Sequence, residues 1–153
     1  MTLTTKTFAV AAIRNGTVID HIDAGHALKI VKLLKLASHH KMVTLGLNLP
    51  SNTLGYKDII KVEDRELSPE EANQVAILAP KASINIIQDY EVFKKFKVTM
   101  PESIEKVISC PNSRCISNHE NINSSLKVLQ RVKNEIALEC RYCKKVFTHK
   151  EIR

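Results

Sequence analysis

Four cysteines are the residues of this chain best suited to chemistry, and all lie in its last third. They form two close pairs, in the stretches CPNSRC and CRYC, at positions Cys110, Cys115, Cys140 and Cys143. Two short loops with two sulfurs each, joined by enough chain to fold back, match a tetrahedral Zn²⁺ site. Four sulfurs fill the coordination shell and leave no position for water or substrate. The spacing therefore predicts one structural zinc ion per chain.

Other uses of these thiols stay open at this point. Four inert buried cysteines, a redox Cys-x-x-Cys pair and rubredoxin-like iron are the alternatives. His119 and His149 lie close to the cysteines in sequence and could each replace a sulfur. Because four cysteines already satisfy the ion, both histidines are interpreted as surface residues or as neighbours of the ligands.

Motifs of catalytic sites are missing from the sequence. Its four glycines all precede residue 56, and no phosphate-binding glycine loop, GxSxG or HExxH occurs. Asp20 and His21 are adjacent, but neighbours on a strand face opposite ways, so the pattern favours a sheet-edge histidine over a catalytic pair. Lysines at 94, 95 and 97 are typical of a solvated strand end. We therefore expect a binding or regulatory protein and not an enzyme.

Composition and charge fit an ordinary globular chain. Its 153 residues are 44% hydrophobic and carry a formal net charge of +7. Four thiolates with one Zn²⁺ would contribute −2, which leaves about +5. This mild excess suits an anionic small ligand or an acidic protein surface as well as nucleic acid. No segment approaches the ~18 apolar residues of a membrane span and the amino terminus lacks a signal-peptide pattern, so a cytoplasmic location is expected.

Hydrophobic periodicity divides the chain into two parts. Strand character is found at 8–14, 17–22, 42–49, 57–64, 83–88 and 90–98, and helical character at 23–38 and 68–79. The order β, α, β, β, α, β, with some additional strand, predicts an α+β domain at 1–100, with a ferredoxin-like antiparallel sheet and two helices on one face. A linker around Pro101 leads to a small β-rich zinc-ribbon or rubredoxin-like domain at 101–153, which needs the metal because its core is small.

The helix boundaries are marked by particular residues. Asp23 is placed to cap the first helix. Ser68, Pro69 and Glu71 form a capping box with proline in the first turn of the second helix.

Five separated stretches, RNGTVIDHI, TLGLNLPSNTLGYKDIIKVED, APKASINIIQDYEV, CPNSRCISN and CRYC, together resemble the regulatory chains of aspartate carbamoyltransferase. The resemblance runs from about residue 8 to the end. It implies a non-catalytic subunit with a nucleotide-binding allosteric domain that pairs as a homodimer, and a zinc domain that holds a catalytic chain. In this family CTP inhibits the first committed step of pyrimidine biosynthesis, sometimes with UTP, and ATP opposes it.

The resemblance also implies an effector site. Its expected contacts are Val10, Ala12, Ile13, Asp20, His21, Lys61, Asn85, Ile87, Tyr90, Val92 and Lys95. By this comparison the two lysines and His21 meet phosphate or ribose oxygens, Asp20 accepts from a ribose hydroxyl, and Ile13 and Tyr90 read the base through main-chain groups.

Three positions depart from the family pattern. Ala11 stands where a carboxylate is usual, and Arg114 and Lys144 are more basic than expected beside the metal ligands. A zinc-ribbon protein that binds RNA or DNA is the alternative, although 5% aromatic residues and no tryptophan provide few stacking surfaces. A small redox enzyme is a second alternative.

Overall fold

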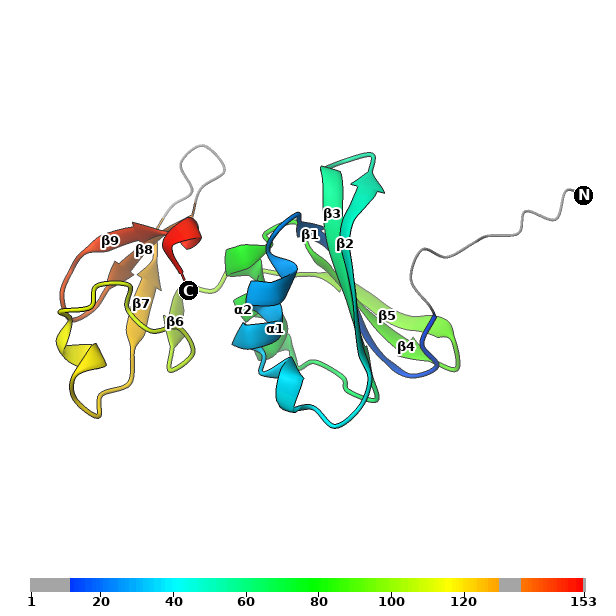
Figure 1. Cartoon of the computed structure of the whole chain (residues 1–153), viewed down its shortest axis with the longest axis horizontal. Helices are drawn as coiled ribbons and strands as arrows, with labels where there is room; N and C mark the ends of the chain where they lie inside the picture. The colour runs from blue at the N-terminus through cyan, green and yellow to red at the C-terminus, as the bar shows by residue number, and fades with distance from the viewer. Residues whose placement is uncertain (1–11, 130–135, 153) are drawn as a thin grey trace, which may run out of the picture.

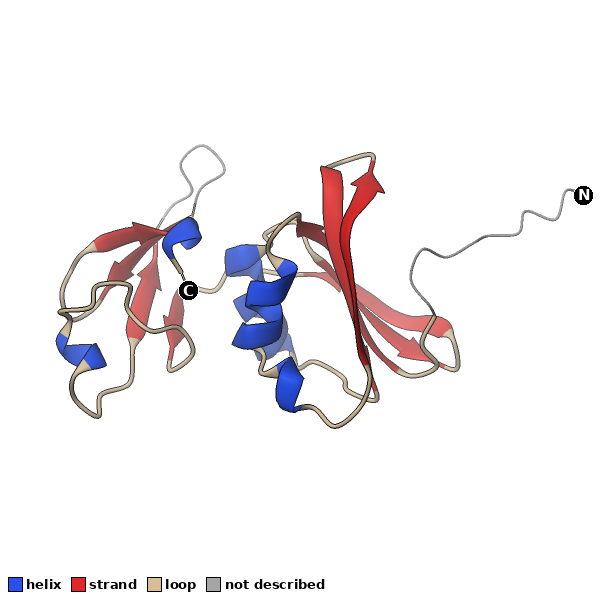
Figure 2. Ribbon diagram, in the orientation of Figure 1, coloured by secondary structure: helices blue, strands red, loops and turns tan. Residues whose placement is uncertain are grey.

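The computed structural model describes residues 12–129 and 136–152 (Figure 1). Its first part contains one sheet and two helices, packed on one side of that sheet (Figure 2). The elements are β1 (Gly16–Asp23), α1 (Ala27–Leu33), β2 (Val43–Ser51), β3 (Gly55–Glu63), α2 (Pro69–Leu78), β4 (Ser83–Gln88) and β5 (Glu91–Lys97). The antiparallel strand order β2-β3-β1-β4-β5 is the ferredoxin-like order with β5 added beside β4.

The second part is a smaller antiparallel sheet. Its strands, in the order β6-β7-β8-β9, are β6 (Ser103–Glu105), β7 (Ser125–Val128), β8 (Ala137–Cys140) and β9 (Val146–Thr148). Short 3₁₀ helices lie at Ile116–Asn118 and His149–Glu151. The predicted α+β class with a zinc-ribbon-like second domain is confirmed.

One face of the larger sheet forms the core. Ile19 of β1 pairs with Ile60 of β3 and with Ile84 of β4, and all three are fully buried in the cluster shared with the helices. Because side chains alternate along a strand, the residues next to these isoleucines point to the opposite, helix-free face. The isoleucine row therefore determines which side of the sheet is available to a ligand.

A second hydrophobic cluster joins the two parts. Ile77 of α2 is buried among residues of the small sheet and its loops, including Ile108 and Ile152. Leu33 of α1 packs against both clusters. The helical side of the first part therefore faces the second part, as Figure 1 shows. Within the described ranges, neither helix is both long and apolar enough to cross a membrane.

Two predicted boundaries are wrong. The first helix does not begin at Asp23, which remains paired with Lys57 in the β1–β3 ladder. Its carbonyl accepts from the N–H of His26, and His26 is the N-cap. Of the strand predicted at 8–14, the described residues 12–14 are not in a strand and the others lie outside the described residues. The capping box of Ser68 and Glu71 at the start of α2 is confirmed.

Candidate functional sites: a cysteine cluster and a cationic sheet face

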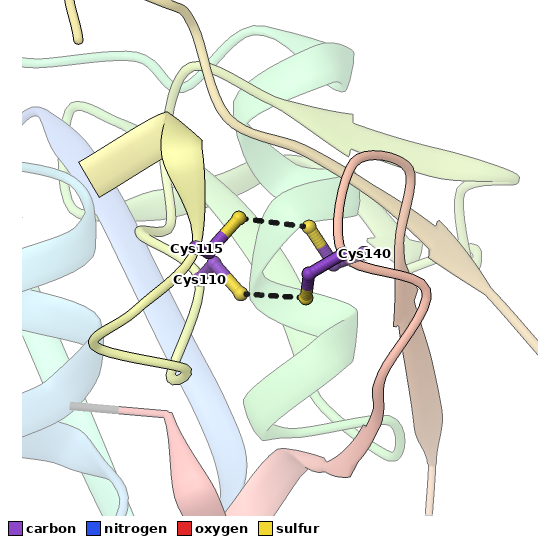
Figure 3. A group of neighbouring side chains, drawn as sticks. Cys110, Cys115 and Cys140 are labelled. Atoms are coloured by element: carbon purple, nitrogen blue, oxygen red, sulfur yellow. Dashed lines mark hydrogen bonds between the residues drawn. The ribbon is translucent and has the colours of Figure 1, made fainter. Parts of the chain in front are cut away.

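The four cysteines come together in one cluster. Cys110 and Cys115 lie in and beside the loop after β6, and Cys140 and Cys143 lie at the end of β8 and in the turn that follows (Figure 3). Their four sulfurs lie within 4.8 Å of one another, with 3.8 Å between Cys110 and Cys143 and 3.7 Å between Cys115 and Cys140. A tetrahedron with metal–sulfur bonds of ~2.3 Å has edges of about 3.8 Å. The cluster therefore fits one tetrahedral metal ion.

The thiols differ in their electrostatic environment. Burial raises the pKa of Cys110 and also that of Cys140. For Cys143 burial acts in the same direction, but hydrogen bonds led by the backbone N–H of Lys145 outweigh it and lower the pKa to about 7. Hydrogen bonds from Ser117 likewise outweigh burial and lower the pKa of Cys115. A cation bound here would hold all four as thiolates and release protons on binding.

The two nearby histidines differ from each other. His119 is exposed, as expected, and its Nε2 lies 2.7 Å from the carbonyl oxygen of Ser113. His149 is buried, so the surface interpretation is wrong for it. Its Nδ1 accepts from the N–H of Ile136 at 3.2 Å, and its ring faces His26 of the first part.

The helix-free face of the larger sheet gathers six of the predicted effector residues. The strand registers align Lys61 of β3, Val18 of β1, Asn85 of β4 and Lys95 of β5 in one row across four strands. The neighbouring rows on the same face contain Asp20 on one side and Ile87 with Val92 on the other. Residues that are far apart in sequence are thus brought together by pairing alone.

Lys61 has an unusual position within this row. It is only 8% exposed, and burial lowers its pKa below 10.5 although the nearby Asp20 carboxylate acts in the opposite direction. A partly desolvated ammonium group interacts more strongly with an anion, because less water screens the attraction.

Asp20 and His21 do not behave as neighbours on a regular strand. The register of β1 with β3 shifts between Ile19 and Ile22, and His21 has a left-handed φ of 57°. This bulge cancels the alternation, so His21 Nδ1 lies 3.9 Å from Asp20 Oδ2. The expectation of a sheet-edge histidine is wrong, because β1 lies between β3 and β4.

A cavity of about 360 Å³ opens beside this bulge. It is lined by His21, Thr53, Leu54, Pro80, Lys81, Ser83, Lys95, Lys97 and Val98. Four of these side chains are basic, and none of the described residues in the lining is acidic. The cavity therefore suits a polyanion of small-molecule size.

Three other predicted contacts, Ala12, Ile13 and Tyr90, lie before β1 or in the turn between β4 and β5. Ile13 is buried and Ala12 exposed in the segment before β1. Tyr90 is exposed in the turn between β4 and β5, where its N–H donates to the carbonyl of Arg14. Val10 lies outside the described residues.

Sequence reasoning missed several residues of this region. Lys57 binds Asp20, with 2.9 Å between Nζ and Oδ1, and Ser83 Oγ lies 3.3 Å from His21 Nδ1. Lys81 and Lys97 line the cavity. Lys97 could have been found from the strand pairing, since Ser83 pairs with both Asp20 and Lys97. Lys57 could not, because the bulge that brings it to Asp20 has no sequence signal.

Comparisons with known proteins agree with this architecture. A family model described as aspartate carbamoyltransferase regulatory chain, allosteric domain, matches residues 8–99, and one described as the metal binding domain of that chain matches residues 102–153. Neither description is of a catalytic domain.

Curated relatives cover almost the whole chain. The aspartate carbamoyltransferase regulatory chain of Vibrio parahaemolyticus is 49% identical over 139 residues, or 91% of this chain and 90% of the relative. That of Aeromonas salmonicida is 48% identical with the same coverage, and that of Shigella dysenteriae is 49% identical over 140 residues, or 92% and 91%. The chain therefore belongs to the family of aspartate carbamoyltransferase regulatory chains, with an allosteric domain followed by a metal-binding domain.

Proposed function

We propose that this chain is the non-catalytic regulatory subunit of an aspartate carbamoyltransferase, and that it binds CTP and ATP, with UTP as a further ligand, on the helix-free face of its larger sheet. Residues 1–100 would bind the nucleotide and residues 101–153 would hold a catalytic chain, which places the protein in the control of pyrimidine biosynthesis. The observation that carries the proposal is the row from Lys61 to Lys95, which leads into a cavity with four basic side chains.

The charges along the face give the nucleotide an orientation. The cavity with Lys81, Lys95 and Lys97 suits the phosphates, since ammonium groups are strong partners of phosphate oxygens. At the other end, Ile87 pairs with Val92 and the exposed Tyr90 lies close by, which gives an apolar surface for a base. Asp20 lies between the two ends and can accept from a ribose hydroxyl.

Another cavity is less suitable for a triphosphate. It measures about 410 Å³ and lies at the opposite end of the sheet, where Asp64, Glu66 and Asp89 contribute carboxylates and Arg65 the one basic side chain of its described lining. Triphosphate oxygens would be repelled there.

For the metal-binding domain we propose Zn²⁺. An all-sulfur tetrahedral set with edges near 3.8 Å is typical of structural zinc, and a complete shell leaves no place for a substrate. The ion would hold together the two loops that carry the cysteines. These loops expose Arg114, Ile116, Tyr142 and Lys144, which form the surface we assign to the catalytic chain. Its basic charge suits an acidic patch on that partner.

The homodimer is also supported by exposed residues. The strand β2 lies at an edge of the sheet, where its outward N–H and C=O groups can pair with another chain. Four large apolar side chains are exposed near this edge: Leu28 on α1, Met42 just before β2, Leu47 in β2 and Tyr56 in β3. A second copy of the chain would cover them.

The experiment is reconstitution with the catalytic chain of the same organism, followed by activity assays against aspartate with and without each nucleotide. We expect CTP to lower and ATP to raise the activity of the complex, while the catalytic chain alone is active and indifferent to both. A complex that forms but ignores both nucleotides would contradict the proposal.

A matched pair of variants tests the binding face. Lys95 pairs with Asn85 and faces the helix-free side, whereas the adjacent Lys94 pairs with the buried Ile86 and lies over the ring of Phe96 on the other side. We expect Lys95→Ala to weaken CTP binding by about tenfold or more, which is the loss of one charge-assisted hydrogen bond. Lys94→Ala should change CTP affinity by less than about twofold. Equal effects of the two substitutions would place the nucleotide elsewhere.

Metal analysis tests the second part of the proposal. We expect one zinc per chain, and its complete removal should release catalytic subunits that are active and no longer respond to nucleotides. Sensitivity to CTP that survives complete removal would contradict a role of the ion in holding the catalytic chain.

A further inference from the structure

A short segment connects the proposed effector site with the metal-binding domain. Only four residues separate His21, in the bulge beside the cavity, from His26, the N-cap of α1. The ring of His26 meets that of His149 in the metal-binding domain edge to face, with 5.9 Å between ring centroids and 83° between planes. The proposed effector site and the domain contact are thus neighbours along the chain.

The ring of His26 also binds the end of α2. Its Nδ1 contacts the carbonyl oxygen of Leu78, and because a carbonyl can only accept, Nδ1 carries the proton. Leu78 is the last residue of α2, and the preceding Ile77 is buried among residues of the metal-binding domain. His26 therefore contacts the metal-binding domain through His149, and it also contacts α2, the helix that packs against that domain.

A buried carboxylate fixes the backbone on both sides of His26. Asp58 of β3 is fully buried, and its Oδ2 accepts from the N–H groups of Gly25 at 3.0 Å and Ala27 at 3.2 Å. The preceding residue, Lys57, binds Asp20 on the effector side. Two consecutive residues of β3 therefore connect the effector site with the start of α1.

The contact between the domains is incompletely packed. A cavity of about 200 Å³ lies between the helices and the metal-binding domain, with Lys29, Leu33 and Leu78 on one side and Val107, Ile108 and Ile152 on the other. Free volume beside a buried contact allows it to take more than one arrangement. Two arrangements with different affinities for CTP and ATP are what regulation requires.

We infer that His26 is a positioning residue for regulation, which transmits the state of the effector site to the metal-binding domain through its hydrogen bond to the Leu78 carbonyl. The inference rests on the proposed function. A displacement of Asp20 on nucleotide binding acts on Lys57 and Asp58, which hold residues 25–27, and His26 passes it to α2 through the Leu78 carbonyl.

Three variants of the complex with its catalytic chain test this role. His26→Phe keeps a ring but removes the donor to Leu78. His26→Asn removes the ring but can keep an amide N–H near the position of Nδ1. His39→Phe is the matched control, because His39 also binds a backbone carbonyl, that of Glu63 at 2.7 Å, but within the allosteric domain.

For each variant, the binding of CTP and ATP is measured by calorimetry and the response by activity with and without the nucleotide. We expect His26→Phe to bind CTP and ATP with affinities within about threefold of the wild-type values. Adding either nucleotide should change the activity of this variant by less than about twofold, which is below the roughly 5- to 150-fold effect that allosteric coupling ordinarily has on affinity. His26→Asn and His39→Phe should keep the wild-type response. Loss of response with retained binding separates a positioning role from a merely structural one.

The outcomes distinguish this inference from the proposed function. A wild-type complex that neither binds nor responds to nucleotides refutes the proposed function itself. A responsive wild type with an equally responsive His26→Phe overturns the inference alone, as does an equal loss in His26→Phe and His26→Asn, which would exclude the hydrogen bond as the carrier.

A measurement on the unmodified chain applies even if His26→Phe fails to assemble. The imidazole nitrogen resonances of His26 in the full regulatory chain should differ between the CTP-bound and ATP-bound forms, while those of His39 should not. Identical His26 resonances in the two forms would overturn the inference.

Discussion

The two domains form their sites in opposite ways. In the metal-binding domain the four cysteines come from two short loops, and their spacing in the sequence was enough to predict that the sulfurs cluster, as they do within 4.8 Å. In the allosteric domain the row from Lys61 to Lys95 exists only because four strands pair in one register. On the proposed function, the metal-binding domain would need its ion to fold, whereas the allosteric domain would have to fold before it could bind a nucleotide. A single substitution in one domain should therefore affect the stability of that domain and leave the other unchanged.

The largest expected effect follows from removing one metal ligand. Cys115→Ser should abolish tight metal binding and unfold the metal-binding domain, because the proposed zinc ion would supply roughly 10–16 kcal/mol that a core of this size cannot replace. Metal analysis and hydrogen exchange measure this, with protection lost in β7 and β8 and kept in β1 and β4. The control is Ser113→Ala, an exposed position in the same loop. Unchanged exchange in β7 and β8 would show that the domain folds without its ion.

The corresponding change in the allosteric domain is Gly16→Ala. Gly16 has a φ of 142°, and a Cβ there would lie 2.0 Å from the carbonyl oxygen of Val62. We expect a loss of about 3 kcal/mol in the free energy of unfolding of this domain, because the clash is with backbone that is paired in the ladder. Denaturant-dependent hydrogen exchange of β1 and β4 measures it, and the metal content should stay at the wild-type value. Gly25→Ala is the control, because Gly25 also has a positive φ, of 93°, but a Cβ there meets nothing within 4 Å. Equal losses in the two variants would mean that the clash with Val62 is not the cause.

A third change addresses the buried carboxylate of Asp58. Its two oxygens accept from the N–H groups of Gly25, Ala27 and Asn48. Asp58→Asn replaces one acceptor with a donor that faces an N–H group, so we expect a loss of about 2–3 kcal/mol in the unfolding free energy of the allosteric domain. Asp64→Asn, an exposed carboxylate 3.8 Å from Lys41, should cost less than about 0.5 kcal/mol. If the two variants were equally stable, the hydrogen bonds of Asp58 would be energetically unimportant.

The smallest effect concerns the capping box of α2. Burial raises the pKa of Glu71, but hydrogen bonds from Ser68 and Arg65 outweigh it and lower the pKa below 4.5. A lowered carboxylate pKa adds stability above the unfolded-state value, and this stability is lost as the pH falls through the folded-state value. Glu71→Gln should therefore cost about 1 kcal/mol at neutral pH and progressively less below pH ~4.5. Denaturant titrations between pH 3 and 7 test this. A cost that stays constant with pH would contradict the charge-dependent part.

Local patterns determined which features could be predicted. The metal ligands follow from spacing, the start of α2 from Ser68, Pro69 and Glu71, and the order of elements from periodicity. The start of α1 was misjudged, because pairing with Lys57 keeps Asp23 in the strand. The burial of His149 was missed for a similar reason, since its contact with His26 spans the two domains and leaves no local pattern.

The predicted effector residues came from resemblance and not from periodicity. Alternation could place Lys95 and Asn85 on one face, but it could not predict the bulge at His21 or the resulting contact of Lys57 with Asp20. The bulge depends on a left-handed φ at His21, which changes the side of the sheet that the residue faces. Nothing in the sequence marks a histidine for that torsion.

The row across four strands also constrains how this protein can change over generations. Exchanging one side chain in the row alters a single contact and leaves the pairing intact, so ligand preference can drift by small steps. A deletion of one codon within β1, β3, β4 or β5 would instead turn that strand's remaining members toward the helices. Related chains should therefore differ in the residues along this face while the lengths of these four strands stay the same.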